Sequence, residues 1–122
     1  LFKNIQKFWF DLDETLVWRW IEIKEVISFL SIVRKHGGKI GLLTRHTFPV
    51  DKTLRKIGLQ YSFFDDVIIV KHDELKSKYI RGCDFLIDNE FQQRLDVSKN
   101  SGALALDCDQ IDFVDQINSF RM

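Results

Sequence analysis

Asp11 and Asp13 carry the most specific chemical signal in the sequence. They lie in the stretch FWFDLDETL, where an apolar segment runs directly into two carboxylates separated by one residue. One carboxylate in such a pair can attack as a nucleophile and form a covalent acyl-phosphate. The other can donate a proton to a leaving group and later activate water. Aspartates also cap helices and form turns, so the pair alone leaves a structural interpretation equally open.

Short apolar stretches alternate along the chain with segments of helical spacing. This alternation is typical of α/β proteins in which helices cover both faces of a parallel sheet. We therefore expect one domain over residues 1–122, an α/β three-layer sandwich with a five-stranded, mostly parallel, Rossmann-like sheet. The expected strands are residues 7–12, 39–43, 67–70, 84–87 and 103–106. The expected helices are residues 22–36, 49–57, 73–80, 90–97 and 109–120.

Polar residues stand at the carboxyl ends of three of these expected strands. Asp11 and Asp13 follow the first strand, Thr44 follows the second, and Asp88 follows the fourth. Ligands of open α/β sheets bind outside the carboxyl ends of the strands. These side chains, which come from three separate segments, should therefore meet at one rim of the sheet.

The order of these residues resembles that of a known family. The haloacid dehalogenase-like (HAD) phosphohydrolase superfamily has four ordered motifs, which this chain matches with Asp11-x-Asp13-x-Thr15, Thr44, Lys76 and Asp88. The resemblance covers about residues 8–106. It implies a HAD-like core and a Mg²⁺-dependent phosphomonoester hydrolase that acts through an aspartyl-phosphate.

The resemblance also implies a role for each matched residue. Asp11 would be the nucleophile, and Asp13 would be the general acid and then the base for the hydrolytic water. Thr44 would hydrogen-bond a phosphoryl oxygen, and Lys76 would offset the negative charge. Asp11, Asp13 (through its backbone carbonyl) and Asp88 would bind Mg²⁺, which prefers oxygen ligands.

Some of these assignments have alternatives. We favour Lys76 because it stands near the start of the expected helix before the fourth strand, with Lys71 second and Lys78 third. Arg45 directly follows the strand-end threonine, so we expect it to contact the phosphorylated substrate, whose identity the sequence does not name. His46 comes next, and we expect it to face water.

The fourth motif departs from the common family pattern. Many members have two adjacent acids, whereas Asp88 is followed here by Asn89 and Glu90. The neutral amide leaves weaker metal binding or lost activity open. The alternative hypothesis is a catalytically weak or inactive HAD-like module that binds a partner. The region before and after residue 80 is also similar to small HAD-like proteins associated with surface-carbohydrate synthesis.

No segment has room for the cap domain that many family members insert. Only residues 14–21 separate Asp13 from the first expected helix, and the resemblance implies that they form a β-hairpin flap over the site. Trp18 and Trp20 in this flap would pack, form a small partner interface, or stack on a substrate. Thr15 would stabilise the loop before the flap through local hydrogen bonds. We therefore expect a capless site, from which water is excluded by the flap, by a partner subunit of a homo-oligomer, or by the substrate itself.

Composition excludes several other classes of protein. Lys and Arg together number 18, as do Asp and Glu, and this balance argues against a general nucleic-acid binder. No apolar run approaches the length that spans a bilayer, so we expect no membrane partner. Cys83 and Cys108 do not make a disulfide framework. We expect both to be small buried side chains in a cytoplasmic protein.

Overall fold

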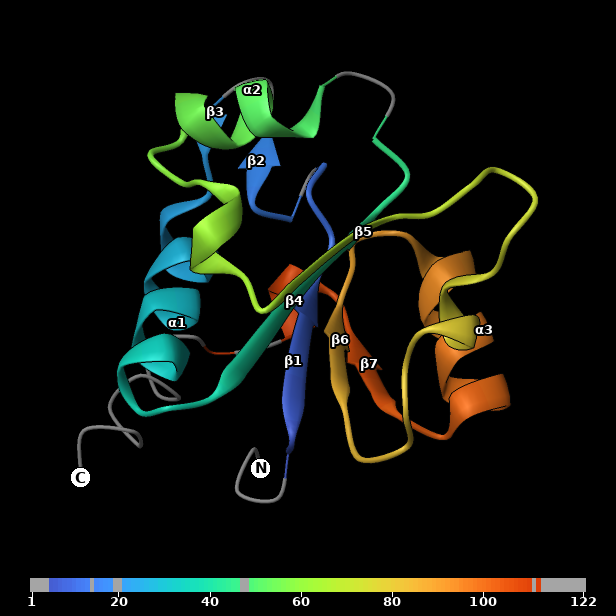
Figure 1. Cartoon of the computed structure of the whole chain (residues 1–122). Helices are drawn as coiled ribbons and strands as arrows, with labels where there is room; N and C mark the ends of the chain where they lie inside the picture. The colour runs from blue at the N-terminus through green and yellow to red at the C-terminus, as the bar shows by residue number, and fades with distance from the viewer. Residues whose placement is uncertain (1–4, 14, 19–20, 47–48, 111, 113–122) are drawn as a thin grey trace.

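The central sheet of the computed structural model has five strands, and all of them are parallel (Figure 1). The structure describes residues 5–13, 15–18, 21–46, 49–110 and 112. The strand order is β5-β4-β1-β6-β7. The expected five-stranded, mostly parallel, Rossmann-like sheet is confirmed at this level. The strands are β1 Lys7–Phe10, β4 Lys39–Thr44, β5 Asp66–Ile69, β6 Phe85–Ile87 and β7 Leu104–Leu106.

Helices cover both faces of this sheet, which gives three layers. Helix α1 lies on one side and α3 on the other (Figure 1). The flap expected after β1 is present as an antiparallel hairpin of β2 and β3. The helices are α1 Lys24–Lys35, α2 Val50–Lys56 and α3 Phe91–Ser101, and the 3-10 turns are η1 Tyr61–Phe63, η2 Lys76–Lys78 and η3 Cys108–Gln110. The hairpin strands are β2 Val17–Trp18 and β3 Ile21–Glu22.

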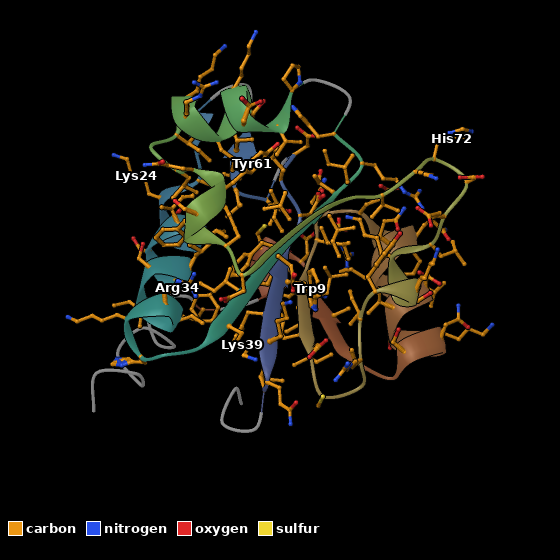
Figure 2. All side chains as sticks on the ribbon, in the orientation of Figure 1. Trp9, Lys24, Arg34, Lys39, Tyr61 and His72 are labelled. Atoms are coloured by element: carbon orange, nitrogen blue, oxygen red, sulfur yellow. The ribbon has the colours of Figure 1, made fainter. Side chains whose placement is uncertain are left out.

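Strand β1 supplies residues to both hydrophobic cores because successive side chains point to opposite faces. Phe8 and Phe10 face α1, where their rings lie 5.7 and 6.3 Å from the ring of Phe29. Trp9 faces the other way and packs in the cluster that contains Val97 of α3. Figure 2 labels Trp9 on this central strand. The alternation fixes the register of β1, and so fixes where Asp11 emerges.

Helix α1 forms where the apolar spacing predicts it. Its buried residues are Val26, Phe29, Leu30 and Val33, a spacing that places them on one helical face. The helix ends before Gly37, whose φ of 79° lies in the left-handed region that glycine adopts without strain. The short connection leads directly into β4, which carries Thr44.

Three expectations about the chain need correction or fall outside the described residues. The helix expected over residues 73–80 is only the 3-10 turn η2. Of the helix expected over 109–120, the described part is the turn η3, and the remainder lies outside the described residues. Cys83 is exposed rather than buried, because it lies in the turn before β6, while Cys108 is half-buried.

None of the helices in the described part of the chain is both long and apolar enough to cross a membrane.

Candidate active site

Three strand ends bring the principal polar side chains together. Asp11 directly follows β1, Thr44 is the last residue of β4, and Asp88 directly follows β6. These strands are adjacent in the sheet, and the backbone N–H of Asp11 donates to the carbonyl oxygen of Ile87 at 2.9 Å. All three residues are buried. The structure therefore places them at one edge of the sheet, as the strand ends predict.

Lys76 lies between the two buried carboxylates. Its Nζ is 3.0 Å from Oδ1 of Asp11 and 2.5 Å from Oδ2 of Asp88, and only 2% of the residue is exposed. The alternatives Lys71 and Lys78 are both exposed. Of the three lysines considered, Lys76 is therefore the one that the fold brings to the aspartates.

Helix α3 holds Lys76 in place, although no helix forms around it. The backbone N–H and the hydroxyl of Ser77 donate to Asp96 at 3.0 and 2.8 Å, and the hydroxyl of Ser101 donates to the carbonyl of Ser77 at 3.0 Å. These bonds occupy backbone groups that a helix over 73–80 would have used. Of its apolar residues, Leu75 is exposed and Ile80 is buried. The bonds to α3 therefore account for the turn that replaces the expected helix.

Burial is the largest single influence on the electrostatics of Asp11 and Lys76. Burial, together with the neighbouring charge of Asp88, raises the pKa of Asp11 to about 7, although Lys76 opposes the rise. Burial acts to lower the pKa of Lys76, but the two carboxylates outweigh it and hold that pKa above its ordinary value. The lysine is therefore charged at neutral pH, and one cation faces two acids. A further cation would stabilise the ionised form of Asp11.

Asp13 is bound to a buried histidine. Nδ1 of His46 lies 2.9 and 2.8 Å from the two carboxylate oxygens of Asp13, and Nε2 lies 2.8 Å from the hydroxyl oxygen of Thr53 on α2. The backbone N–H of His46 also donates to Oγ1 of Thr44 at 3.0 Å. Because the threonine oxygen accepts that bond, its hydrogen can be donated to a ligand oxygen. The expectation that His46 faces water is wrong, because its ring packs beneath α2 and only 9% of the residue is exposed.

A pocket of about 530 Å³ opens at these residues. Arg45 lines it, as expected for a substrate contact, and its Nη2 donates to the backbone carbonyl of Glu74. Nε of Arg45 is buried and has no hydrogen-bond partner among the described residues. The lining residues are Asp11, Asp13, Thr44, Arg45, Lys76, Asn89, Glu90, Phe91 and Gln93.

Asp88 does not belong to that lining. Its Oδ1 accepts the backbone N–H of Glu90 at 2.9 Å, and its backbone carbonyl accepts a bond from Nη1 of Arg94 at 2.9 Å. Glu90 is the exposed residue that precedes α3, in extended backbone conformation. Asn89 and Glu90, which follow Asp88 in the chain, do line the pocket.

The donor chemistry of the site fits Mg²⁺ in type. Asp11, Asp13 and Asn89 offer oxygen atoms at the pocket, and burial raises the pKa of Asp11, so a cation that binds there would favour its ionised form. Both carboxylate oxygens of Asp88 already have partners, Lys76 and a backbone N–H. No group of three or more His, Cys, Asp or Glu side chains within the described ranges is arranged to hold a metal ion. Asp11 and Asp13 are thus the fitting donors, and Asp88 has only its remaining lone pairs to offer.

Sequence reasoning missed several residues of the pocket and misassigned one. His46 had a detectable signal, since it stands two residues after a strand-end threonine, but its pairing with Asp13 depends on how α2 packs. Phe91 and Gln93 lie in the first turn of α3 and gave no separate signal.

The hydroxyl of Thr15 is buried and has no hydrogen-bond partner among the described residues, because backbone bonds to the carbonyl of residue 12 close the loop instead. Trp20 and the side chain of residue 18 lie outside the described residues.

Comparisons with known proteins leave these residues as the basis for any functional assignment. No protein-family model matches the chain, and neither a curated protein nor a solved structure matches it.

Proposed function

We propose that this chain is a capless, HAD-like phosphomonoester hydrolase that depends on Mg²⁺ and acts through an aspartyl-phosphate on Asp11. The observation that supports the proposal most is the shared pocket. Asp11 and Asp13 come from one segment, Thr44 from a second and Lys76 from a third, and all four line one cavity at the carboxyl ends of the strands. Nucleophile, acid–base group, phosphoryl contact and cation would then all stand within reach of one substrate.

The proposed reaction has two steps on one carboxylate. An oxygen of Asp11 attacks phosphorus, the bond from phosphorus to the leaving oxygen breaks, and Asp13 gives that oxygen a proton. Asp13 then takes a proton from water as the water attacks the aspartyl-phosphate, so inorganic phosphate leaves and the Asp11 carboxylate is restored. The two proton transfers balance over the cycle.

The remaining residues stabilise charge and position the phosphoryl group. Thr44 donates its hydroxyl hydrogen to a phosphoryl oxygen, and Lys76 and Arg45 supply positive charge. Asp11, the backbone carbonyl of Asp13 and a remaining lone pair of Asp88 would hold Mg²⁺. The metal, when bound, screens the repulsion between the anionic nucleophile and the anionic phosphate. Phosphoryl transfer relies mostly on such positioning and charge stabilisation.

A second candidate function follows from the departure at Asn89. The neutral amide and the two existing partners of the Asp88 carboxylate reduce the negative charge available to a metal. These features favour a HAD-like module that binds a phosphorylated ligand or a partner and turns over weakly or not at all. No turnover of any phosphate in a broad panel, together with a stable complex recovered from the source cells, would support this second candidate over the first, whereas tight Mg²⁺-dependent binding of beryllofluoride would count against it.

The test is Mg²⁺-dependent release of phosphate from a panel of phosphorylated metabolites, sugars, nucleotides and phosphopeptides. Wild type should be active with Mg²⁺ and inactive with EDTA. Asp11→Asn should abolish phosphate release, whereas Asp51→Asn, at a half-buried site on α2 paired with Arg55, should leave it intact. Unchanged activity in Asp11→Asn would eliminate Asp11 as the nucleophile. The absence of phosphate release by wild type would reject the hydrolase.

A further inference from the structure

The pocket is larger than the phosphoryl-binding residues require. Its volume of about 530 Å³ falls within the range of sites that hold small organic molecules. Asp11, Thr44 and Lys76 provide for the phosphoryl group. Besides Asp13 and Arg45, the rest of the wall among the described residues comes from the junction of β6 and α3, namely Asn89, Glu90, Phe91 and Gln93. That wall is therefore available to the part of the substrate that leaves.

His46 holds the proposed acid in one position. The side chain of Asp13 is 55% exposed, and an exposed aspartate ordinarily samples several rotamers. The ring of His46 is buried, and it contacts both carboxylate oxygens through Nδ1. An N–H at Nδ1 can donate to one carboxylate oxygen of Asp13 and leave the other oxygen to carry the proton of the acid. Nε2, on the far side of the ring, contacts the hydroxyl of Thr53, which is 1% exposed and lies on α2.

A positioned acid matters most for a poor leaving group. An aryl oxide or an acyl group departs from phosphorus without much help, whereas an alkoxide needs a proton as the bond breaks. General acid catalysis of this kind depends on close placement of the donor. The contacts of Asp13 with His46 therefore suit a phosphate ester of an aliphatic alcohol.

The wall at α3 contains a buried hydrogen-bond acceptor that has no donor, and a substrate could supply that donor. Gln93 lines the pocket and is 6% exposed, and its Oε1 is buried without a hydrogen-bond partner among the described residues. Glu90, on the same wall, also accepts hydrogen bonds when ionised. An unmade bond at a buried polar atom is costly, so a ligand that makes it gains affinity. A hydroxyl group suits Gln93 in either orientation of its amide, because a hydroxyl both donates and accepts.

From these two observations we infer the substrate class: a small phosphate monoester of an aliphatic, hydroxyl-bearing alcohol, such as a polyol or sugar phosphate. His46 acts as a positioning residue for Asp13, and Gln93 binds a hydroxyl of the leaving group. This inference rests on the proposed function. The reaction it specifies is transfer of the phosphoryl group to Asp11, with departure of the alcohol after Asp13 has protonated its oxygen.

Three substrates separate the two parts of the inference. p-Nitrophenyl phosphate has a good leaving group, n-propyl phosphate has a poor one, and glycerol 1-phosphate adds hydroxyls to the same carbon chain. The measured quantity is kcat/KM, which covers the steps up to departure of the alcohol. It excludes the later hydrolysis of the aspartyl-phosphate, in which Asp13 acts as a base whichever alcohol has left.

The His46 arm compares two leaving groups. His46→Leu should lower kcat/KM for n-propyl phosphate by about 100-fold or more, and for p-nitrophenyl phosphate by less than about fivefold. His46→Asn, whose amide N–H can take the place of Nδ1–H, should recover most of the loss. It also serves as the second variant if the leucine variant does not fold. His72→Leu, at an exposed loop position, is the control and should change neither value. An equal loss with both substrates would mean a purely structural role and would overturn this part.

The Gln93 arm compares glycerol 1-phosphate with n-propyl phosphate. Wild type should prefer the glycerol ester by about tenfold or more, because the propyl ester leaves the buried acceptor unpaired. Gln93→Met, which keeps the length of the side chain without its amide, should bring the ratio close to one. A wild-type ratio near one, or a ratio that Gln93→Met does not change, would overturn the role of Gln93.

Failure of the proposed function gives a different pattern. If no substrate is turned over, p-nitrophenyl phosphate included, the hydrolase is rejected and calorimetric binding decides the substrate class. Glycerol 1-phosphate should then bind about tenfold more tightly than n-propyl phosphate to wild type, and equally to Gln93→Met. Equal affinities in wild type would overturn the substrate class as well.

Discussion

Asp11→Asn should make the protein more stable in the absence of divalent cations, although it removes the proposed nucleophile. Asp11 is 7% exposed and shares one lysine, Lys76, with a second buried acid, Asp88. Its ionised form therefore loses hydration and meets a like charge. The amide of asparagine has nearly the same shape and no charge, so the substitution removes this unfavourable interaction while keeping the packing.

The size of the effect follows from the pKa of Asp11. Burial and the neighbouring acid raise this pKa from its ordinary value of 3.8 to about 7. Between these two values the folded state binds more protons than the unfolded state, so this carboxyl makes wild type progressively less stable as pH rises through that window. A pKa difference of one unit corresponds to about 1.4 kcal/mol, so the full cost above pH 7 is about 4 kcal/mol. Relaxation around the charge lowers this figure, and we expect about 2–4 kcal/mol.

Urea unfolding in EDTA at pH 5 and pH 8 measures the effect. The free energy of unfolding of Asp11→Asn should exceed that of wild type at pH 8 by about 2–4 kcal/mol, and by about 2 kcal/mol less at pH 5. Asp51→Asn, at a half-buried position away from the site, should show no gain that grows with pH. If Asp11→Asn is less stable than wild type at pH 8, or if its gain does not increase with pH, the electrostatic reasoning about this site is refuted.

Three further predictions concern the lysine, the sheet and the cysteines. Lys76→Met should lower the free energy of unfolding by about 3–5 kcal/mol, because it leaves two buried acids without their cation, and urea unfolding should show the loss. Gly41→Ala should cost about 1–3 kcal/mol by the same measurement, because an added Cβ would overlap the buried ring of Trp9; a neutral result would contradict the packing of β1 against β4. At pH 8 iodoacetamide should modify exposed Cys83 at least about tenfold faster than Cys108, whose pKa burial raises to about 11, as followed by mass spectrometry. Equal rates would contradict the burial of Cys108.

The sheet and its polar rim could be predicted because both depend on local patterns. Short β-branched and apolar runs mark the strands, and a polar residue directly after a strand must lie at its carboxyl end. Asp11, Thr44 and Asp88 follow this rule, and the parallel strand order brings them together without any further information. The choice of Lys76 rested on its position before the fourth strand, and the fold brings this lysine to the two aspartates although the helix expected around it does not form.

Contacts that depend on tertiary packing could not be predicted in the same way. The contact of His46 with Asp13 exists because Thr53 on α2 holds the far side of the ring, and the packing of that short helix has no signature in the sequence near residue 46. The turn at η2 likewise depends on Asp96, a residue of α3 that bonds the backbone of Ser77. Side-chain partners from distant segments decided both outcomes, and local propensity does not encode them.

The central claim, that Asp11 becomes phosphorylated, is tested most directly by trapping the intermediate. Wild type and Asp11→Asn would be mixed with Mg²⁺ and a turned-over phosphate ester, quenched rapidly with acid and reduced with borohydride, which converts an aspartyl-phosphate to homoserine. Peptide mass spectrometry would then locate the product. We predict homoserine at position 11 in wild type, dependent on Mg²⁺ and absent from the variant. Turnover with no modification at position 11, or with modification at another carboxylate, would contradict the account.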